Sequence, residues 1–227
     1  VSEIECRELA RWADQLIEQQ YTRENLVARV AYPSDKTDNR DSYAFAIHSP
    51  GSPVTRDLPG LPMEAMHPAL SAVTSRVAEA MHVDNGRLLF NVQRYGDSSK
   101  EVPRHFDGEF FETVTRPDGA FDVRRGVRPK SVAILTLINR TIGGGTTLFP
   151  QDRTEAFVVE GRAGDLLVFD NIAYEHGVKS MVAMTGARDT WARYVIGWRA
   201  LDDDNDLRPQ KVVVPVVVRA ATPERAR

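Results

Sequence analysis

The chain has 227 residues, of which 42% are hydrophobic, and carries a formal net charge of −3. A chain of this length can bury one sizeable core, so we expect a single domain over 1–227, with helical support over about 1–85 and a β-rich core over about 86–220. The acidic balance and the scattered Lys and Arg argue against nucleic acid as a partner. The single cysteine, Cys6, excludes an intramolecular disulfide, and no apolar run is long enough to span a membrane. With no signal peptide ahead of the first predicted helix, we expect a cytoplasmic protein.

Two helices are predicted in the first third of the chain. The first covers residues 2–20, because Ser2 and Glu5 have the spacing of a capping box and apolar residues recur at helical intervals, at Cys6, Leu9, Ala13 and Leu16. Residues 31–62 are rich in Pro, Gly, Ser and Asp, which predicts a long surface excursion that holds only short strands. Pro68 predicts the start of the second helix, whose buried stripe comprises Leu70, Val73, Val77 and Met81.

From residue 86 onward the sequence is typical of short strands. Several segments are rich in β-branched and aromatic residues: "RLLFNVQRY", "SVAILTLIN", "AFVVE", "DLLVFD", "RYVIGWRAL" and "KVVVPVVV". Helices followed by many short strands favour a mainly β fold with flanking helices, either a sandwich or a barrel. The last segment predicts an added strand or a dimer contact, with Pro215 favouring an edge position, so that a monomer and a homodimer both stay open.

Three residues are candidate metal ligands. In the extended stretch "PRHFDGEF", His105 and Asp107 are two positions apart, so their side chains point to the same side. His176 follows a predicted buried strand in "GDLLVFDNIAYEHGV". The remaining histidines lie in a loop or beside the second predicted helix and are interpreted as ordinary surface or core residues: His48, His67 and His82.

The types of ligand favour iron over zinc. Two imidazoles and one carboxylate on one face of an octahedral ion leave three positions open, as in non-haem Fe(II) oxygenases. Zinc hydrolases commonly use a helical H-E-x-x-H pair, which this sequence lacks. We therefore expect His105, Asp107 and His176 to bind Fe(II).

An anion-binding residue is predicted in "RYVIGWRAL". Arg193 opens this apolar strand, and a buried arginine is costly unless its planar guanidinium meets a carboxylate, which it binds through two parallel hydrogen bonds. We expect that role for Arg193. For Arg199, further along the same segment, we expect instead an edge position, paired with solvent or with an acid such as Asp202.

Taken together, these segments give the chain a resemblance to the Fe(II)/2-oxoglutarate-dependent dioxygenases, particularly their prolyl-4-hydroxylase-like branch. The resemblance covers residues 86–203 and, more loosely, "SEIECRELARWAD" near the N-terminus. It is carried by four segments in order: "NVQRYGDSSKEVPRHFDGEFF", "SVAILTLIN" with "GGGTTLFP", "VVEGRAGDLLVFDNIAYEHGV" and "ARYVIGWRAL". The resemblance implies a double-stranded β-helix core, also described as a jelly roll or cupin-like core.

The resemblance also implies the rest of the site. It implies 2-oxoglutarate as cosubstrate and O2 as oxidant, and it allows ascorbate as a reductant. Arg193 would hold the distal carboxylate of 2-oxoglutarate, with hydrogen bonds from Tyr95 and Thr147, although Tyr95 is equally consistent with a core tyrosine. Asp107 favours hydroxylation over halogenation, because related halogenases have a small residue in place of this carboxylate. Desaturation, epoxidation and ring formation stay open.

Two features depart from the family's pattern. Arg193 follows His176 at a greater distance than the basic residue usually follows the distal histidine. The intervening "KSMVAMTGARDTW" therefore looks like an inserted loop, and Arg188 becomes a rival for the carboxylate. Leu137 stands where some relatives have a tyrosine, so that tyrosine's hydrogen bond is missing or comes from Thr136.

Substrate contacts are expected in "DGEFFETVTRPDGAFDVRRGVRPK", a connection long enough to form a lid. Phe110 is a candidate for lining the pocket, and Arg124 and Arg128 for meeting an acidic group, although charged loop residues are more often simply solvated.

The leading substrate class is a small molecule, either amino-acid-like or a specialised metabolite. Three alternatives stay open. The first is a prolyl or other residue of a polypeptide, and the second is an alkylated nucleic acid, because Arg193 and Arg199 reproduce the Arg-x5-Arg spacing of alkylation-repair dioxygenases. The third is a non-catalytic jelly-roll module that binds a ligand or partner.

Overall fold

The computed structural model describes residues 1–20, 40–48, 60–83, 88–107, 110–115, 121–127, 129–151, 155–184, 191–200 and 216–218. Within these ranges the chain forms two α-helices, α1 (Glu3–Gln20) and α2 (Pro68–Met81), together with a 3₁₀ turn at Met63–Ala65. The remaining elements are strands, and their pairings are antiparallel apart from one parallel pair, β1 with β2. None of the helices in the described part of the chain combines the length and apolar character that a membrane crossing needs.

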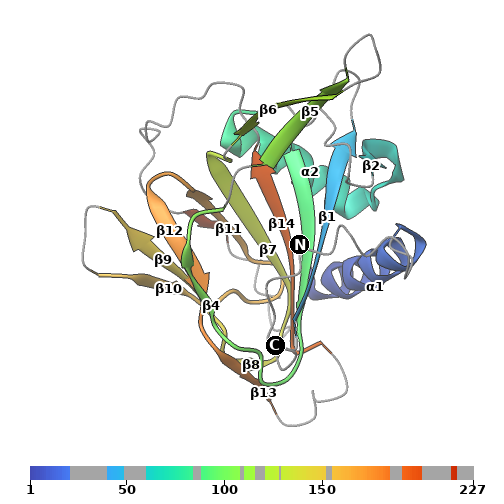
Figure 1. Ribbon diagram of the computed structural model, residues 1–227. Coiled ribbons are helices and arrows are strands. Elements are labelled where there is room, and N and C mark those ends of the chain that lie inside the picture. The colour runs from blue at the N-terminus through green and yellow to red at the C-terminus, as the bar shows by residue number, and fades with distance from the viewer. Residues whose placement is uncertain are drawn as a thin grey trace.

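Two antiparallel sheets face each other and enclose the interior (Figure 1). The larger sheet has seven strands: in order, β15 (Val216–Val218), β11 (Leu166–Asp170), β7 (Ser131–Asn139), β14 (Arg193–Ala200), β3 (Leu88–Tyr95), β1 (Arg40–His48) and β2 (Gly60–Pro62). The smaller sheet has four: β10 (Phe157–Val159), β9 (Thr146–Pro150), β12 (Tyr174–Val178) and β4 (Val102–His105).

The chain passes back and forth between these sheets. Successive strands β3, β4, β7, β9, β11, β12 and β14 alternate between the larger and the smaller sheet, with β10 added beside β9. This is the connectivity of a jelly roll, in which Greek-key crossovers bring strands distant in sequence side by side. The predicted double-stranded β-helix with flanking helices is therefore confirmed.

Two short ribbons extend from the core. The strands β5 (Phe110–Thr115) and β6 (Phe121–Val127) pair as an antiparallel hairpin at the top of Figure 1, in the connection between β4 and β7. At the opposite end, β8 (Thr141–Gly143) pairs with β13 (Met181–Ala183). Of this ribbon, β13 lies in the segment predicted to be an inserted loop, residues 179–191.

Both helices cover the outer face of the larger sheet (Figure 1). The capping box of α1 is present, since the Ser2 backbone N–H donates to a Glu5 carboxylate oxygen at 2.8 Å and the Glu5 N–H donates to Ser2 Oγ at 3.3 Å. On the inner side of α2, Trp198 of β14 donates from Nε1 to Thr74 Oγ1 at 2.9 Å. The predicted helices therefore form where expected, and α2 supports the outer face of β14.

Two histidines that we interpreted as ordinary residues flank α2. His67 is the N-cap, and its Nδ1 accepts from the Ala69 N–H at 3.3 Å. His82 is the C-cap in the left-handed conformation, with φ of 55°. Both therefore have capping roles and lie outside the candidate metal site.

The surface excursion predicted for residues 31–62 is wrong in one part. Residues 40–48 form β1, which pairs with β3 and extends the larger sheet, and Phe45 is fully buried against Phe90 with ring centroids 5.9 Å apart. A strand in this stretch was expected, but its burial in the larger sheet was not, because that burial comes from pairing with a distant segment rather than from local composition. The stretches on either side of β1 lie outside the described residues.

The predicted C-terminal strand is confirmed over Val216–Val218, where β15 pairs with β11 at the edge of the larger sheet. Pro215, on which the edge prediction rested, lies outside the described residues.

Candidate metal and anion site

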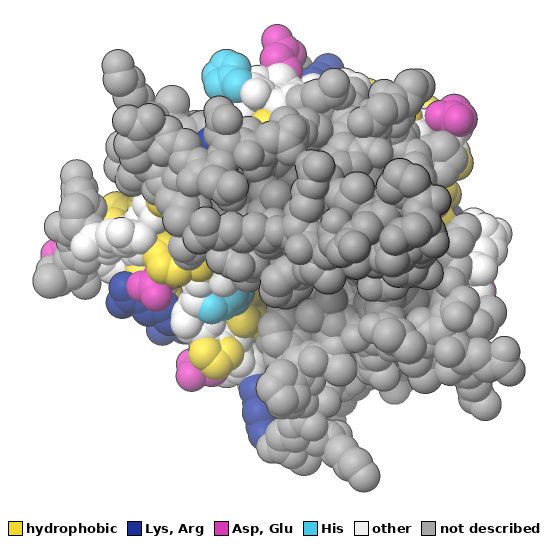
Figure 2. All heavy atoms as spheres, turned by 45° about the horizontal axis from the view of Figure 1, so that its top comes forward, with side chains coloured by type: hydrophobic (Ala, Val, Ile, Leu, Met, Phe, Trp, Pro, Cys, Tyr) yellow, Lys and Arg dark blue, Asp and Glu magenta, His cyan; other side chains and the backbone are white. Residues whose placement is uncertain are grey.

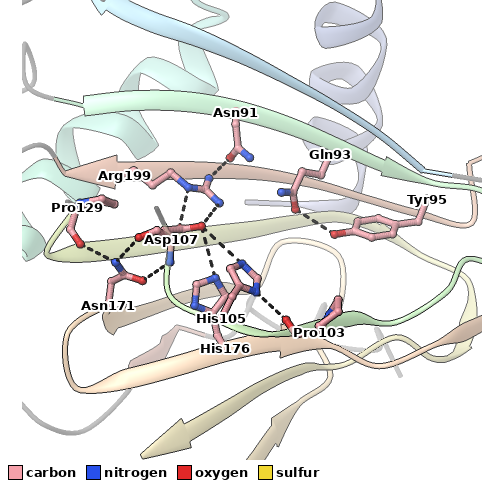
Figure 3. A network of polar contacts seen from close by, with 10 residues as sticks. All are labelled: Asn91, Gln93, Tyr95, Pro103, His105, Asp107, Pro129, Asn171, His176 and Arg199. Carbon is pink, nitrogen blue, oxygen red and sulfur yellow. Dashed lines mark hydrogen bonds and ion pairs between the residues drawn. The ribbon is translucent and has the colours of Figure 1, made fainter. Parts of the chain in front are cut away.

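The three candidate ligands converge in the interior between the sheets (Figure 3). His105 ends β4 and His176 lies on β12, and the two residues are direct cross-strand partners. Asp107 follows two residues after His105, so the extended chain returns its side chain to the same side. One possible ligand atom from each of the three lies within 4.8 Å of the others. The convergence predicted from His105, Asp107 and His176 is therefore present.

The histidine rings are oriented for coordination. Nδ1 of His105 lies 2.7 Å from the Pro103 carbonyl oxygen, a contact that requires a proton on Nδ1 and leaves the Nε2 lone pair free. The Nε2 atoms of His105 and His176 lie 3.9 Å and 3.7 Å from Oδ1 of Asp107. The ring of Phe169 packs edge-on against His176 at 5.0 Å between centroids. Burial and the neighbouring His176 both lower the pKa of His105, which favours the neutral ring that a metal binds.

Asp107 pairs with a residue that our sequence prediction placed elsewhere. Arg199 is 9% exposed, and its Nε donates to Asp107 Oδ2 at 2.8 Å. Burial alone would raise the pKa of Asp107, but the Arg199 guanidinium and His176 lower it well below its usual range. The edge position expected for Arg199 is therefore wrong, because β14 lies between β7 and β3 in the middle of the larger sheet.

Asn91 and Gly197 hold Arg199 in place. Asn91 and Gly197 are partners across β3 and β14, and the Asn91 Oδ1 accepts from Nη1 of Arg199. A Cβ at position 197 would overlap Asn91 Oδ1 and come within 2.9 Å of Arg199 Nη1. The strand therefore needs glycine here because the bond between Asn91 and Arg199 occupies the space of a side chain.

Asn171 contacts the main chain of Asp107. Its Oδ1 accepts from the Asp107 N–H at 2.9 Å, and its Nδ2 donates to the Pro129 carbonyl oxygen at 2.7 Å (Figure 3). Asn171 is fully buried at the start of the turn that leads from β11 into β12.

The predicted anion-binding arginine is buried with unused hydrogen-bonding capacity. Arg193 is 3% exposed, and its Nη2 donates to Thr146 Oγ1 at 3.1 Å. Its Nη1 is buried without a hydrogen-bond partner, and its guanidinium lies 5.2 Å from the ring centroid of Tyr95. Burial lowers the pKa of Arg193, and no carboxylate in the described part of the chain pairs with it. The guanidinium therefore keeps hydrogen-bonding capacity and a positive charge that no described carboxylate neutralises.

Tyr95 lies beside Arg193 and along β3 from Asn91. It is buried, and its hydroxyl donates to Gln93 Oε1 at 3.0 Å. The tyrosine is therefore a core residue in its packing and also a wall of the space next to Arg193. Asn91, Gln93 and Tyr95 alternate along one face of β3 and make that side of the interior polar (Figure 3).

The structure brings Thr146 to Arg193 instead of Thr147. Neighbouring residues of β9 face opposite sides of the sheet, and Thr147 lies on the outer face, where it lines a groove with Arg104 and Phe149. Its hydroxyl is buried and has no hydrogen-bond partner. Leu137, which the resemblance placed opposite a tyrosine of some relatives, is buried in the core beneath the helices.

The predicted substrate residues cannot be placed. The side chains of Phe110 and Arg124 are not among those described, and Arg128 lies outside the described residues, as do Arg188 and Asp202. Of the hairpin that carries the first two, only the backbone pairing of β5 with β6 is described.

Arg199 was predicted at an edge, and three further residues of the site were not predicted from the sequence: Asn91, Thr146 and Asn171. A spacing signal existed only for Arg199, which lies six positions after Arg193 and therefore on the same face of an extended strand. The other three depend on which distant strands pair, which no local pattern reveals.

The site is deeply set but reaches the surface at His105, whose side chain is 33% exposed, compared with 6% for His176. On the face shown in Figure 2, histidine side chains (cyan) are visible at the surface among hydrophobic, basic and acidic side chains. Of the three candidate ligands, His105 has the most exposed side chain.

No protein-family model matches the chain, and no curated protein matches it by sequence. Solved structures do resemble it. A prolyl-4-hydroxylase from Pseudomonas putida is 17% identical, with 89% of each chain covered and a TM-score of 0.48. A prolyl hydroxylase from Trichoplax adhaerens, in complex with a peptide of the hypoxia-inducible factor oxygen degradation domain, is 16% identical over 87% of this chain and 78% of that chain, with a TM-score of 0.46.

A 2OG-Fe(II) oxygenase family oxidoreductase from Burkholderia pseudomallei is also similar, at 14% identity over 85% of this chain and 89% of that chain, with a TM-score of 0.43. Likeness at these identities and TM-scores assigns no activity by itself.

Proposed function

We propose that the protein is an Fe(II)- and 2-oxoglutarate-dependent dioxygenase that hydroxylates a carbon–hydrogen bond of a small molecule. In this reaction one oxygen atom of O2 enters the alcohol product and the other enters succinate, with release of CO2. The observation that carries the proposal is the combination of a His105–Asp107–His176 cluster with a buried, unpaired Arg193 in the same interior.

The donor set fits Fe(II). Two neutral imidazoles and one ionised carboxylate suit a divalent first-row metal, and three ligands leave positions open for a cosubstrate and O2. Arg199 supports this arrangement because its short bond goes to Oδ2 of Asp107, at 2.8 Å, while Oδ1, which faces the two histidines, accepts only a longer bond from Nη2 at 3.4 Å. Bound iron would supply the redox chemistry, coupling the reduction of O2 to the decarboxylation of 2-oxoglutarate.

Arg193 fits the distal carboxylate of 2-oxoglutarate. Its Nη1 has no hydrogen-bond partner among the described residues. Its Nη2 donates to Thr146, which fixes the orientation of the guanidinium. Arg193 and Arg199 are six residues apart on one face of β14, and Arg199 marks the metal end of that face. Six residues of strand span about 20 Å, so the two long side chains leave room for a short dicarboxylate between Arg193 and the metal.

The chain's own residues would bind and orient the cosubstrate and would keep bulk water from the site. Arg193, Thr146 and Tyr95 would hold one end of the cosubstrate, while Asp107 and both histidines direct the other end to the metal. Because Asp107 and His176 are 8% and 5% exposed, bulk water has little access to these two ligands, whereas His105 lies nearer the surface. Ordered, dry surroundings of this kind strengthen the electrostatic interactions within the site.

We propose a polar small molecule of the amino-acid type as the substrate class. The polar wall of Asn91, Gln93 and Tyr95 and the partly exposed His105 support it. The second candidate is a residue of a polypeptide, which the same chemistry would serve.

The test is aerobic incubation of the purified protein with Fe(II), 2-oxoglutarate and ascorbate, with succinate measured by mass spectrometry. Free amino acids, proline-containing peptides and N-methylated oligonucleotides form the substrate panel. We expect succinate that depends on Fe(II) and is lost in His176→Ala, and an oxidised product from the amino-acid part of the panel. A product from the peptides alone would move the assignment to a polypeptide hydroxylase. A folded, iron-loaded protein that forms no succinate would contradict the oxygenase assignment and favour a binding module.

A further inference from the structure

Asn171 joins the candidate iron site to the hairpin segment above it. Asp107 lies two residues beyond the end of β4, so the strand ladder does not hold its main chain. Of the hydrogen bonds that described residues make with Asp107, those to the carboxylate come from Arg199 and those to the main chain come from Asn171. The backbone of this ligand therefore depends on one side chain.

The same side chain holds the far end of the segment. Asp107 and Pro129 border residues 108–128, the connection that contains β5 and β6. The Asn171 amide accepts from the Asp107 N–H at 2.9 Å and donates to the Pro129 carbonyl oxygen at 2.7 Å. In addition, the Asn171 N–H donates to the Lys130 carbonyl oxygen at 2.7 Å. An asparagine suits this place because one amide offers both an acceptor and donors.

We propose that Asn171 is a positioning residue that fixes the Asp107 main chain for metal binding and ties Asp107 and Pro129, which border residues 108–128, to the turn that leads into β12, the strand of His176. The inference rests on the proposed function, since it assumes that Asp107 is a metal ligand. Partners that orient a metal ligand affect metal affinity even though they never touch the ion. Asn171 thus acts through Asp107, and the hairpin above the site shares its anchor with that ligand.

The test is an anaerobic titration with Co(II) as the probe, following its visible absorption in wild type, Asn171→Ala and Gln151→Ala. Gln151 is the matched control, because its Nε2 donates at 2.6 Å to the carbonyl of Ile172 in the same turn but does not contact Asp107. We expect the Co(II) dissociation constant to rise about 10- to 100-fold in Asn171→Ala and to stay within about twofold in Gln151→Ala.

A second variant separates the amide oxygen from the amide nitrogen. Asn171→Asp keeps an oxygen that accepts from the Asp107 N–H but loses the nitrogen that donates to the Pro129 carbonyl at 2.7 Å and, more weakly, to the Asp107 carbonyl at 3.4 Å. We expect this variant to bind Co(II) nearly as wild type does, while amide hydrogen exchange becomes faster in Phe110–Thr115 and Phe121–Val127. Asn171→Asp also keeps the inference testable if Asn171→Ala does not fold.

The outcomes separate the inference from the proposed function. Unchanged Co(II) affinity in a folded Asn171→Ala, with binding in the wild type that His176→Ala abolishes, would overturn the role of Asn171 alone. Unchanged hydrogen exchange of β5 and β6 in Asn171→Asp would overturn the link to the hairpin. Wild-type binding that survives His176→Ala would overturn the metal site and, with it, both proposals.

Discussion

Arg199 and Asp107 form a buried ion pair in which the guanidinium takes one side of the carboxylate and the two histidines take the other. Nε of Arg199 lies 2.8 Å from Oδ2, whereas Oδ1 lies 3.9 Å and 3.7 Å from the Nε2 atoms of His105 and His176. Nη2 of Arg199 also donates to Oδ1, at the longer distance of 3.4 Å. The arginine therefore keeps the carboxylate ionised and binds most closely the oxygen that points away from the histidines.

Replacing Arg199 with methionine should destabilise the metal-free protein by about 3–5 kcal/mol, because Asp107 would stay buried without a compensating charge. Urea unfolding measures the change. The matched control is Arg104→Met, which breaks an ion pair with Glu175 in which the arginine side chain is 50% exposed. The control should cost at most about 1 kcal/mol. Equal losses of unfolding free energy in the two variants would show that the buried ion pair stabilises the protein no more than the exposed one does.

Gly197 and Asn91 should be energetically coupled, because a side chain at position 197 would occupy the space of the Asn91 amide. Gly197→Ala should cost about 1–3 kcal/mol, since the new Cβ would overlap the Asn91 amide that binds Arg199. Asn91→Ala removes the obstructing amide, so the double variant should be more stable than the sum of the two single changes predicts. A double-mutant cycle of unfolding free energies measures this. Strict additivity would mean that the glycine is not required by the bond between Asn91 and Arg199.

Adjacent threonines of β9 provide an isosteric comparison. Thr146→Val removes the hydroxyl that accepts from Arg193, so the dissociation constant for 2-oxoglutarate should rise by about tenfold, the usual cost of one hydrogen bond to a charged group. Thr147→Val should leave that constant unchanged, because Thr147 faces the groove on the other side of the sheet. Isothermal titration in the presence of Mn(II) measures both. An equal effect of the two changes would contradict this orientation of β9.

The buried thiol of Cys6 predicts a dependence of stability on pH. Burial raises the pKa of Cys6 to about 11, and the thiol is fully shielded between α1 and the larger sheet. A raised pKa favours the neutral thiol in the folded protein, so its contribution is complete below the unfolded pKa of about 8.5 and is lost as the pH rises toward the folded value.

The unfolding free energy should therefore fall between about pH 8.5 and pH 11 by more in wild type than in Cys6→Ala. Alkylation by iodoacetamide at pH 8 should also be slow until the protein unfolds. Rapid alkylation of the native protein would show that α1 opens readily from the sheet.

The ligand cluster was predictable because its signals are local. His105 and Asp107 obey the two-residue period of an extended chain, and His176 follows a strand whose apolar residues mark it as buried. The helices were equally predictable from the sequence, because Ser2 and Glu5 indicate a capping box and Pro68 indicates the first turn of a helix.

The partners of these ligands depend on long-range pairing. The sequence alone does not say whether an arginine near the end of an apolar strand lies inside the fold or at a sheet edge. Arg199 was wrongly assigned to an edge because the pairing of its strand with β7 and β3 was not known. Nothing in a pair of threonines says which one faces inward, so Thr147 was chosen over Thr146. Likewise, Asn171 meets Asp107 only because the chain crosses between the sheets.

The proposed activity requires that Fe(II) binds to His105, Asp107 and His176 and that 2-oxoglutarate binds to Arg193, both in the space between the two sheets. The most direct measurement is an anaerobic titration of the metal-free protein with Fe(II) and then 2-oxoglutarate, following the visible charge-transfer band of the chelate. We predict a band in wild type that disappears in His176→Ala and needs at least about tenfold more 2-oxoglutarate in Arg193→Ala. A folded, iron-loaded wild type that shows no band on addition of 2-oxoglutarate would contradict the account.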